Sequence, residues 1–282
     1  QNAWFAFYDE TYKNINITRS LDAKKTLSAI QIDGNISESV WNVSETIGKN
    51  LFGDHNNTAT FGVLWDDTYL YVAAKVLDDK LINDGGPSYE NDGVEIFIDA
   101  DFNKGTSYDS FDRQFRKNYN DSNIYELNNK TNGVRHALKT ITGGYTVELA
   151  IPWTNLGITA SANTTIGFDI ANNDGDTGGG KDNQTVWNGI VDNWRNTSQF
   201  GELTLSSETV GNKAQLSIQA PLNDEILLSG TEYFISWSSA NVQNIDIDFS
   251  SDNGQQWQSV AKNISAVDSS YAWKVPSLES PS

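Results

Sequence analysis

Apolar and polar residues alternate over short segments along most of this chain. In "GVEIFID" (residues 93–99) the apolar positions 94, 96 and 98 fall on one face of an extended strand, and Glu95, Phe97 and Asp99 fall on the other. The stretches "QFRKNY", "TIGFDIANND", "TVWNGIVDNW" and "FGELTLS" are also predicted to be strands, separated by clusters of Gly, Asn and Asp. No stretch keeps a convincing helical period. The pattern therefore predicts an all-β fold, a β-sandwich of short strands.

The positions of turns and of one polar link divide this pattern into domains. "TFGVLWDDTYLYVAAKVLD" and "VRHALKTITGGYTVELAIPW" each read as two strands around a turn, and the polar link "SSETVGN" precedes a second group of strand-length segments. We assign residues 1–23 to an N-terminal lead-in, residues 24–206 to the first β-sandwich, and residues 213–282 to an immunoglobulin-like β-sandwich. This second domain has about five or six strands where seven are usual. We therefore expect it to be incomplete and to be followed by further domains of a longer polypeptide.

Composition excludes several classes of function. The chain has 282 residues, of which 37 are acidic and 19 are basic, so its formal net charge is −18. This charge should repel nucleic acids and anionic membrane surfaces. Cysteine and methionine are both absent, which excludes disulfides, thiolate metal sites, a cysteine nucleophile and a methionine ligand for haem. We expect no nucleic-acid partner, and the absence of any long apolar run predicts no membrane insertion.

The beginning of the chain and its composition suggest where the protein acts. The first residues, "QNAWFAFYDE", include neither an initiating methionine nor a basic leader segment. Abundant Asn, Thr, Ser and Gly, many aromatic residues and no sulfur are typical of exported proteins. We therefore expect a secreted or cell-surface protein.

An acidic loop follows the strand at residues 93–99 and offers oxygen ligands for a metal ion. Calcium prefers hard carboxylate and amide oxygens, and the loop "DADFNKGTSYDSFD" carries five of them: Asp99, Asp101, Asn103, Asp109 and Asp112. A solvated acidic loop is the alternative interpretation. A second, weaker candidate is "NNDGDTGGGKDN", with Asn173, Asp174 and Asp176, which can also be read as a Gly-rich surface turn.

Seven blocks in a fixed order resemble a known family. They are "IQIDGNISESVWNVSE", "LWDDTYLYVAAKVLD", "NDGVEIFID", "DRQFRKNY", "GGYTVELAIPW", "IGFDIANND" and "VDNWRNTSQFGELTL". Over residues 24–206 this order resembles the family 9 carbohydrate-binding modules, which are sugar-binding β-sandwiches appended to xylanases and related secreted proteins. The resemblance implies the same sandwich and a polysaccharide or oligosaccharide ligand. Similar modules hold structural calcium, which supports the calcium interpretation of the acidic loop.

The resemblance also implies a cleft in which two aromatic rings clamp a sugar. The matching residues here are Tyr89, where the family pattern has tryptophan, and Trp194. Flat aromatic rings suit this task because a pyranose ring presents apolar C–H faces, while its hydroxyl edges need oriented polar partners.

Polar residues beside these rings are expected to contact the sugar hydroxyls. Glu95, Arg116 and Asn118 match the polar part of the family site, and strand periodicity places Gln114 on the same face as Arg116 and Asn118. The planar guanidinium of Arg116 suits vicinal hydroxyls. The alternative interpretation is a cross-strand ion pair between Glu95 and Arg116 that holds two strands together.

The sequence does not favour an enzyme. His55 and His136 lack the neighbours of a catalytic triad or of a metal site, and pairs of carboxylates arise by chance in so acidic a chain. Four tryptophans are expected in the core, and Trp187 is ambiguous: the four are Trp41, Trp65, Trp153 and Trp237.

The function expected from the sequence is non-catalytic binding of a glycan of the β-glucan or xylan type by a secreted multidomain protein. The alternatives are a structural or adhesive surface protein with the same sandwich, and a related sandwich that holds haem. The absence of methionine and the two isolated histidines argue against haem.

Overall fold

The computed structural model describes residues 18–277 except residues 55, 85, 213 and 224. The chain forms two compact units: the first comprises the residues up to Thr26 together with Ile30–Thr209, and the second comprises Leu27–Ala29 and the residues from Val210 onward. One of the two histidines considered above, His55, lies outside the described residues.

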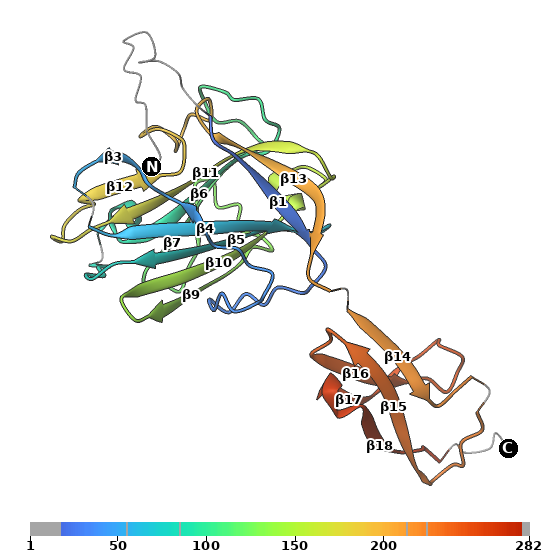
Figure 1. Cartoon of the computed structure of the whole chain (residues 1–282). Coiled ribbons are helices and arrows are strands. Elements are labelled where there is room, and N and C mark those ends of the chain that lie inside the picture. Colours follow the sequence, from blue (N-terminus) through green and yellow to red (C-terminus); the bar gives the residue numbers. More distant parts are fainter. Residues whose placement is uncertain (1–17, 55, 85, 213, 224, 278–282) are drawn as a thin grey trace, which may run out of the picture. The chain divides into compact units, whose positions relative to one another are not determined.

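The regular secondary structure of the first unit is almost entirely strand (Figure 1). Its two short helical segments are the 3₁₀ turn η2 (Ser88–Glu90) and α1 (Trp153–Leu156). Its strands are β1 (Ser20–Thr26), β2 (Glu45–Thr46), β3 (Lys49–Phe52), β4 (Thr58–Trp65), β5 (Tyr69–Leu77), β6 (Gly93–Asp99), β7 (Asp112–Asn118), β8 (Tyr125–Glu126), β9 (Arg135–Ile141), β10 (Gly144–Pro152), β11 (Thr165–Asp174), β12 (Asn183–Val186) and β13 (Gly201–Val210).

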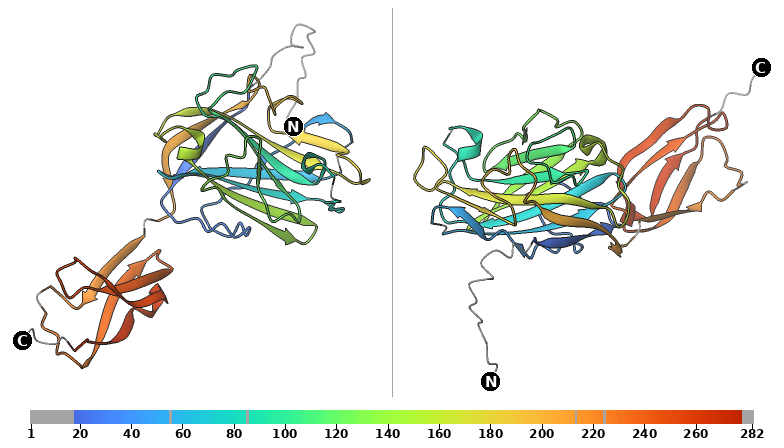
Figure 2. Two further views of the ribbon diagram at one scale, coloured as in Figure 1. Left: turned by 180° about the vertical axis from the view of Figure 1, so that it is seen from behind. Right: turned by 90° about the horizontal axis from the view of Figure 1, so that it is seen from above.

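These strands form one hydrogen-bonded sheet that curls into two facing layers (Figure 2). Its order is β8-β7-β6-β11-β13-β1-β4-β5-β10-β9, and β12 joins β11 to β3. Strand β1 pairs with β4 in parallel at Lys24 and Lys25, and it begins at Ser20, four residues before the start that we expected for the first β-sandwich. The predicted all-β sandwich is confirmed for this unit.

The core lies between the two layers and follows the alternation in the sequence. On β6, Val94, Ile96 and Ile98 are fully buried in it, and the inward residues of β11, such as Phe168 and Ile170, pack in the same cluster. Trp65 and Trp153 also lie there, as predicted. Trp41 was predicted in the core but is only half-buried, and its indole donates a hydrogen bond to Glu148 Oε1 at 3.2 Å. Trp41 belongs to the loop between β1 and β2 and is not part of the apolar core cluster.

A second, smaller apolar cluster lies on the opposite face of β6 and β11. Phe97, Ala171, Val186 and Phe200 form it, and the rings of Phe97 and Phe200 are 6.0 Å apart. Strands β6 and β11 are therefore buried on both faces. This outer face supports the candidate site.

The stretch 185–194 was predicted to be a strand, and most of it is not. Strand β12 ends at Val186, and the chain then forms turns up to residue 195. Trp187 is buried at 1% exposure against Phe61 and Phe168, whereas Trp194 is 48% exposed. The alternation in this stretch therefore does not reflect a strand. Its two tryptophans have different environments: Trp187 packs in the core, and Trp194 is exposed.

The second unit has a small interior. Its strands are β14 (Gln215–Ala220), β15 (Glu232–Ala240), β16 (Asn244–Phe249), β17 (Gln258–Ser265) and β18 (Ser270–Lys274), with the 3₁₀ turn η3 at Ala266–Asp268. They form a three-stranded sheet, β14-β15-β18, and a two-stranded sheet, β16-β17. Among the described residues of this unit, the buried apolar ones are Trp237, Ala266 and Val275. The burial of Trp237 was predicted, while the immunoglobulin-like assignment stays a prediction.

In the part of the chain that the structure describes, every helix is too short or too polar to cross a membrane.

Candidate functional site

A cavity of about 590 Å³ opens on the outer face of β6, β7 and β12. Alternation explains its lining, because the residues between the core positions of these strands must point outward. Its size and its mixture of aromatic and polar side chains are typical of a small-molecule site. The lining residues are Phe52, Tyr89, Glu95, Phe97, Gln114, Arg116, Tyr125, Leu127, Lys181, Gln184, Val186, Ile190, Val191, Asn193 and Trp194.

Both predicted aromatic residues lie in the wall of this cavity. Tyr89 belongs to η2 and is 50% exposed, and Trp194 lies in the turns after β12 with a similar exposure. The Arg195 guanidinium lies 5.0 Å from the centre of the Trp194 ring and is itself paired with Asp192. Large half-exposed rings in a cavity wall offer flat apolar surface to a ligand.

The floor of the cavity is a buried polar network centred on Glu95. Glu95 and Arg116 stand opposite each other in the register of β6 and β7, and Arg116 Nε donates to Glu95 Oε1 at 2.9 Å. Gln114 Nε2 donates to the other oxygen at 2.6 Å, and Asn173 Nδ2 donates to Oε1 at 2.7 Å. Glu95 and Arg116 therefore form a cross-strand ion pair and also line the cavity, so both interpretations of this pair hold.

The charges of this network hold Glu95 ionised. Burial alone would raise the pKa of Glu95, but the cations Arg116 and Lys181 and the bond from Asn173 lower it below its usual value. Arg116 also donates to Ser88 Oγ at 2.7 Å and lies 4.6 Å from the centre of the Tyr125 ring. The guanidinium is therefore fixed in one orientation before any ligand arrives.

Asn118 is the one predicted sugar-site residue that does not line the cavity. It is buried beneath η2, where its Nδ2 donates to the carbonyl of Ser88 at 2.6 Å. The structure therefore gives Asn118 a supporting position under the segment that carries Tyr89.

Several residues that line the cavity were not predicted from the sequence. Lys181 lies in a Gly-rich loop that we had considered for metal binding, and its Nζ is 3.3 Å from Asn173 Oδ1. Gln184 donates to the same oxygen at 2.8 Å. Asn173, a candidate metal ligand in the sequence, therefore belongs to the cavity network. The outward alternation of Gln184 and Val186 on β12 could have indicated this wall, but Tyr125 and Phe52 come from segments without such a signal.

The predicted acidic loop brings three of its five residues together. The carboxylates of Asp99, Asp101 and Asp112 offer oxygens within 4.8 Å of one another. Asn103 and Asp109 lie beside them, since Asn103 Nδ2 donates to Asp101 at 3.2 Å and to Asp109 at 2.6 Å. Burial and the neighbouring carboxylates raise the pKa of Asp112 to about 6, although the amide of Asp109 opposes this shift. Asp112 Oδ1 is buried without a hydrogen-bond partner among the described residues.

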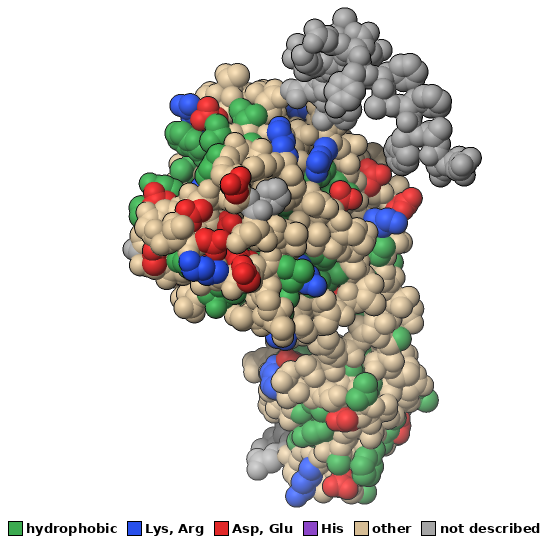
Figure 3. Space-filling model, turned by 60° about the vertical axis from the view of Figure 1, so that its left-hand side comes forward, with side chains coloured by type: hydrophobic (Ala, Val, Ile, Leu, Met, Phe, Trp, Pro, Cys, Tyr) green, Lys and Arg blue, Asp and Glu red, His purple; other side chains and the backbone are tan. Residues whose placement is uncertain are grey.

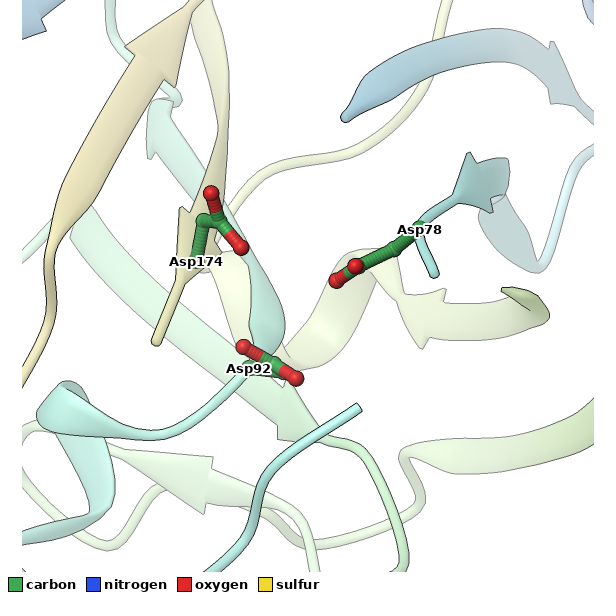
Figure 4. A group of neighbouring side chains, drawn as sticks. All are labelled: Asp78, Asp92 and Asp174. Carbon is green, nitrogen blue, oxygen red and sulfur yellow. The ribbon is translucent and has the colours of Figure 1, made fainter. Parts of the chain in front are cut away.

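A second group of carboxylates was not predicted as a set. Asp78, Asp92 and Asp174 are all buried, their oxygens lie within 4.8 Å of one another, and the side chains converge (Figure 4). Each aspartate lies in the same alternation as the residues of β5, β6 or β11 that point into the core. The three side chains therefore lie at one end of the core, next to the ends of these strands. Because they are far apart in sequence, no local motif reveals them.

The electrostatics of this second group are unfavourable for three free carboxylates. Burial raises the pKa of Asp174 to about 7 and that of Asp92 to about 6, and the acids raise the pKa of one another. Among the described residues, the buried Asn172 side chain, the Tyr145 hydroxyl and Asp174 Oδ1 lack hydrogen-bond partners. Acidic side chains also gather on the face of the first unit shown in Figure 3.

The family is decided by comparison with known sequences. The family described as "Carbohydrate family 9 binding domain-like" matches residues 32–208. The chain belongs to this family. The resemblance stated for residues 24–206 is therefore confirmed, and the family 9 domain is a binding module without catalytic machinery of its own.

This chain is similar to parts of much longer enzymes. It is 39% identical over 183 residues to an endo-1,4-beta-xylanase A of Thermoanaerobacterium saccharolyticum, a match that covers 64% of this chain and 16% of that protein. It is 36% identical over 216 residues to an endo-1,4-beta-xylanase A of Thermotoga maritima, covering 72% of this chain and 20% of that protein. The chain thus spans about a sixth to a fifth of the length of these relatives.

Solved structures of family 9 modules share this fold. A module from Caldicellulosiruptor kristjanssonii in complex with cellotriose matches with a TM-score of 0.61 and 28% identity, over 67% of this chain and 95% of that one. A module from the same organism in complex with glucose matches with the same TM-score and identity, over 69% of this chain and 99% of that one.

Proposed function

We propose that the first unit binds a glycan of the β-glucan or xylan type in the cavity between Tyr89 and Trp194. The observation that carries this proposal is the joint placement of two half-exposed rings above a fixed polar floor. Rings cover the apolar faces of a pyranose, and the polar floor offers donors and acceptors to its hydroxyl edges. The family 9 modules solved with cellotriose and with glucose support a ligand of this chemical class.

The polar floor is suited to recognition because its geometry is already set. Glu95 accepts from three side chains, so it cannot turn toward water, and Arg116 is held between Glu95, Ser88 and the Tyr125 ring. A ligand therefore meets oriented groups and loses little free energy in ordering them.

The same cavity is unsuited to glycoside hydrolysis. That reaction requires two carboxyl groups on either side of the scissile bond, one of them with a raised pKa. Among the described residues that line the cavity, Glu95 is the only carboxylate, and its pKa is lowered. We infer that this chain binds the glycan without cleaving it.

The relatives suggest the setting of this activity. The matched region is a small part of the xylanases. We infer that the module acts in a secreted or cell-surface multidomain protein and holds neighbouring domains close to a polysaccharide.

Structural calcium is part of the proposal. The acidic loop fits calcium through Asp99, Asp101 and Asp112, and the partnerless oxygen of Asp112 is an available ligand. The group Asp78, Asp92 and Asp174 also fits, because a divalent cation would neutralise acids that otherwise repel one another. Calcium would supply charge neutralisation and cross-linking of strand ends at both places.

Isothermal titration calorimetry with cellotriose and xylotriose tests sugar binding. Trp194→Ala should lower the affinity at least about 30-fold, and Tyr89→Ala should weaken it severely, because stacked rings carry a large share of the binding free energy. Trp257→Ala is the matched control, since Trp257 is an exposed tryptophan outside the cavity. If the parent binds neither oligosaccharide, or if Trp194→Ala binds like the parent, the adhesive-scaffold alternative replaces the proposal.

A further inference from the structure

A buried carboxylate lies directly beneath the turns that carry Trp194. Asp169 stands opposite Phe97 in the register of β11 and β6, on the outer face of the sheet, and it is fully buried. Residues 187–196, which we call the Trp194 segment, follow β12 and supply four of the five donors that this carboxylate accepts. The donors are the amides of Ile170 (2.8 Å), Trp187 (3.1 Å), Asn188 (3.1 Å) and Gly189, and Asn193 Nδ2 (3.0 Å).

These bonds replace the ladder that a strand would have provided. The last backbone bond between this region and β11 runs from the Trp187 amide to the Ile170 carbonyl at 2.9 Å. Beyond it, the amides of Asn188 and Gly189 turn to Asp169. The Trp194 segment therefore takes its path from one side chain of the sheet.

Asn193 transmits this constraint to the ring. It lines the cavity and immediately precedes Trp194. Its side-chain Nδ2 donates to Asp169 Oδ2, its Oδ1 accepts from the Ile190 amide at 2.8 Å, and its backbone carbonyl accepts from the Tyr108 hydroxyl at 2.7 Å. Every polar group of the Asn193 side chain is thus committed to the segment or to its support.

Gly189 shows how close the carboxylate and the segment are. A Cβ at this position would lie 2.1 Å from Asp169 Oδ2, which no side chain can tolerate. Lys49 holds the opposite side of the segment by donating to the carbonyls of Asn188 and Gly189 at 2.6 and 2.7 Å. The carbonyls of Asn188 and Gly189 thus bind the exposed Lys49, whereas the amides of the same two residues bind the buried Asp169.

Asp169 is able to accept all of these bonds at neutral pH. Burial raises its pKa to about 6, and the bonds from Asn188, Asn193 and other donors oppose that shift. The carboxyl group is therefore mostly ionised at pH 7, and an ionised carboxylate offers acceptors only.

We propose that Asp169 is a positioning residue that holds the Trp194 segment, and hence the Trp194 ring, in the orientation needed to bind sugar. Only the predicted effect of Asp169 on sugar affinity rests on the proposed function; its effect on the Trp194 segment does not. Asp169→Asn keeps the size of the side chain but replaces one acceptor oxygen by a donor that faces N–H groups. The segment should then shift or become mobile, and affinity for cellotriose should fall about tenfold or more.

The test uses ¹⁹F NMR of the full chain labelled with 5-fluorotryptophan, without sugar. The chain has nine tryptophans, and Trp194→Phe identifies the resonance of Trp194. In Asp169→Asn we expect the Trp194 resonance to shift or broaden, while the resonances of Trp65 and Trp153 keep their positions. A structural defect of the whole sandwich would move all of them.

Asp66→Asn is the matched control. Asp66 accepts from the amides of Thr68 and Tyr69 and from the Tyr71 hydroxyl, each at 2.7 Å, in the turn between β4 and β5. It does not line the cavity. Its substitution should leave the Trp194 resonance and the affinity unchanged.

Hydrogen exchange on the parent chain gives a test that needs no variant. If Asp169 holds the Asn188 and Gly189 amides, both should exchange slowly. Gly189→Ala, which forces the carboxylate and the segment apart, should reproduce the ¹⁹F change. Fast exchange of both amides, or a parent-like Trp194 resonance and affinity in Asp169→Asn, would overturn the proposal. If the parent binds no oligosaccharide, the proposed function fails, and the sugar-free ¹⁹F and exchange results still decide the role of Asp169.

Discussion

At the scale of single residues, Arg116 combines a structural and a recognition role. Its side chain is buried, pairs with Glu95 across two strands and lies against the Tyr125 ring. Removing one partner of a buried ion pair leaves the other charge uncompensated, which typically costs about 3–5 kcal/mol of stability. A substitution that only keeps the positive charge should therefore not preserve the cavity floor, because the planar guanidinium orients the groups around it.

Arg116→Lys tests this dependence on the guanidinium. Lysine keeps the positive charge but cannot donate to Glu95 and Ser88 in the same fixed fork, so we expect about a tenfold to hundredfold loss of oligosaccharide affinity. The domain should remain folded, with a lower Tm. Calorimetry and thermal unfolding of the variant measure the two effects separately.

Arg135→Lys provides the matched control for this substitution. Arg135 is exposed, lies 4.7 Å from the centre of the Tyr69 ring and does not line the cavity. The same chemical change there should leave the affinity as it is. Equal losses at both positions would contradict a specific role for Arg116.

At the scale of elements, strand β6 connects the cavity with both acidic groups. Asp92 precedes its first residue, Asp99 is its last, and Glu95 lies between them. The acidic loop after β6 also touches the Trp194 segment and the residue after it, through Tyr108 Oη to the Asn193 carbonyl at 2.7 Å and Thr197 N to the Gly105 carbonyl at 2.9 Å. Cations at the strand ends would therefore stabilise the elements that frame the cavity.

Calcium removal and pH should act together on the stability of this unit. Without a cation, the pKa values of Asp174 (about 7), Asp92 and Asp112 (about 6) exceed the ordinary value of 3.8. The folded chain then binds protons more tightly than the unfolded chain, so this stability is complete at low pH and is lost as pH rises through 6 to 7. With excess chelator we expect Tm to be at least about 5 °C lower at pH 8 than at pH 5.

Calcium should reverse this trend, because it binds the ionised acids. At pH 8, calcium at about 100 times its dissociation constant should add about 2.7 kcal/mol of stability. Asp174→Asn and Asp112→Asn, compared by differential scanning calorimetry, show which acidic group is responsible. A Tm that is unaffected by chelator at pH 8, with no metal in the purified protein, would contradict the calcium proposal.

At the scale of the whole molecule, the two units differ in how much apolar surface they bury. The first has a continuous core that involves every long strand, whereas the second buries few side chains and exposes several large apolar ones. The exposed ones are Leu216, Ile218, Leu222, Ile226, Leu228, Phe234, Trp257 and Val267. Burial of apolar surface is the dominant favourable term in folding, so the stability of the chain resides mainly in the first unit.

A fragment of residues 1–212 should fold and bind oligosaccharide like the full chain. All residues that line the cavity lie between Phe52 and Trp194, and strand β13 ends at Val210. Calorimetry should give the same affinity within about twofold, and urea unfolding should remain cooperative. A large loss of affinity in this fragment would show that the second unit contributes to the site.

The sequence by itself determined the strands, the core faces and much of the cavity floor. Alternation with a period of two decides which side chains of a strand share a face, so Gln114 and Arg116 could be placed together without coordinates. The resemblance to the family implied that Glu95 joins them from another strand, and the structure places Glu95 opposite Arg116. The ordered motifs added Tyr89 and Trp194, and both line the cavity.

Tertiary structure alone decided the features that depend on contacts between distant segments. Asp78, Asp92 and Asp174 form a group because the inward-facing sides of β5, β6 and β11 end at the same place in the sandwich. The path of residues 187–196 also escaped prediction, because a buried carboxylate on β11 takes the amides that a neighbouring strand would otherwise have paired. Asn118 fell outside the cavity for a similar reason, since the Ser88 carbonyl above it accepts its amide. Periodicity describes the direction of a side chain from its own backbone, and only the folded chain determines what that side chain meets.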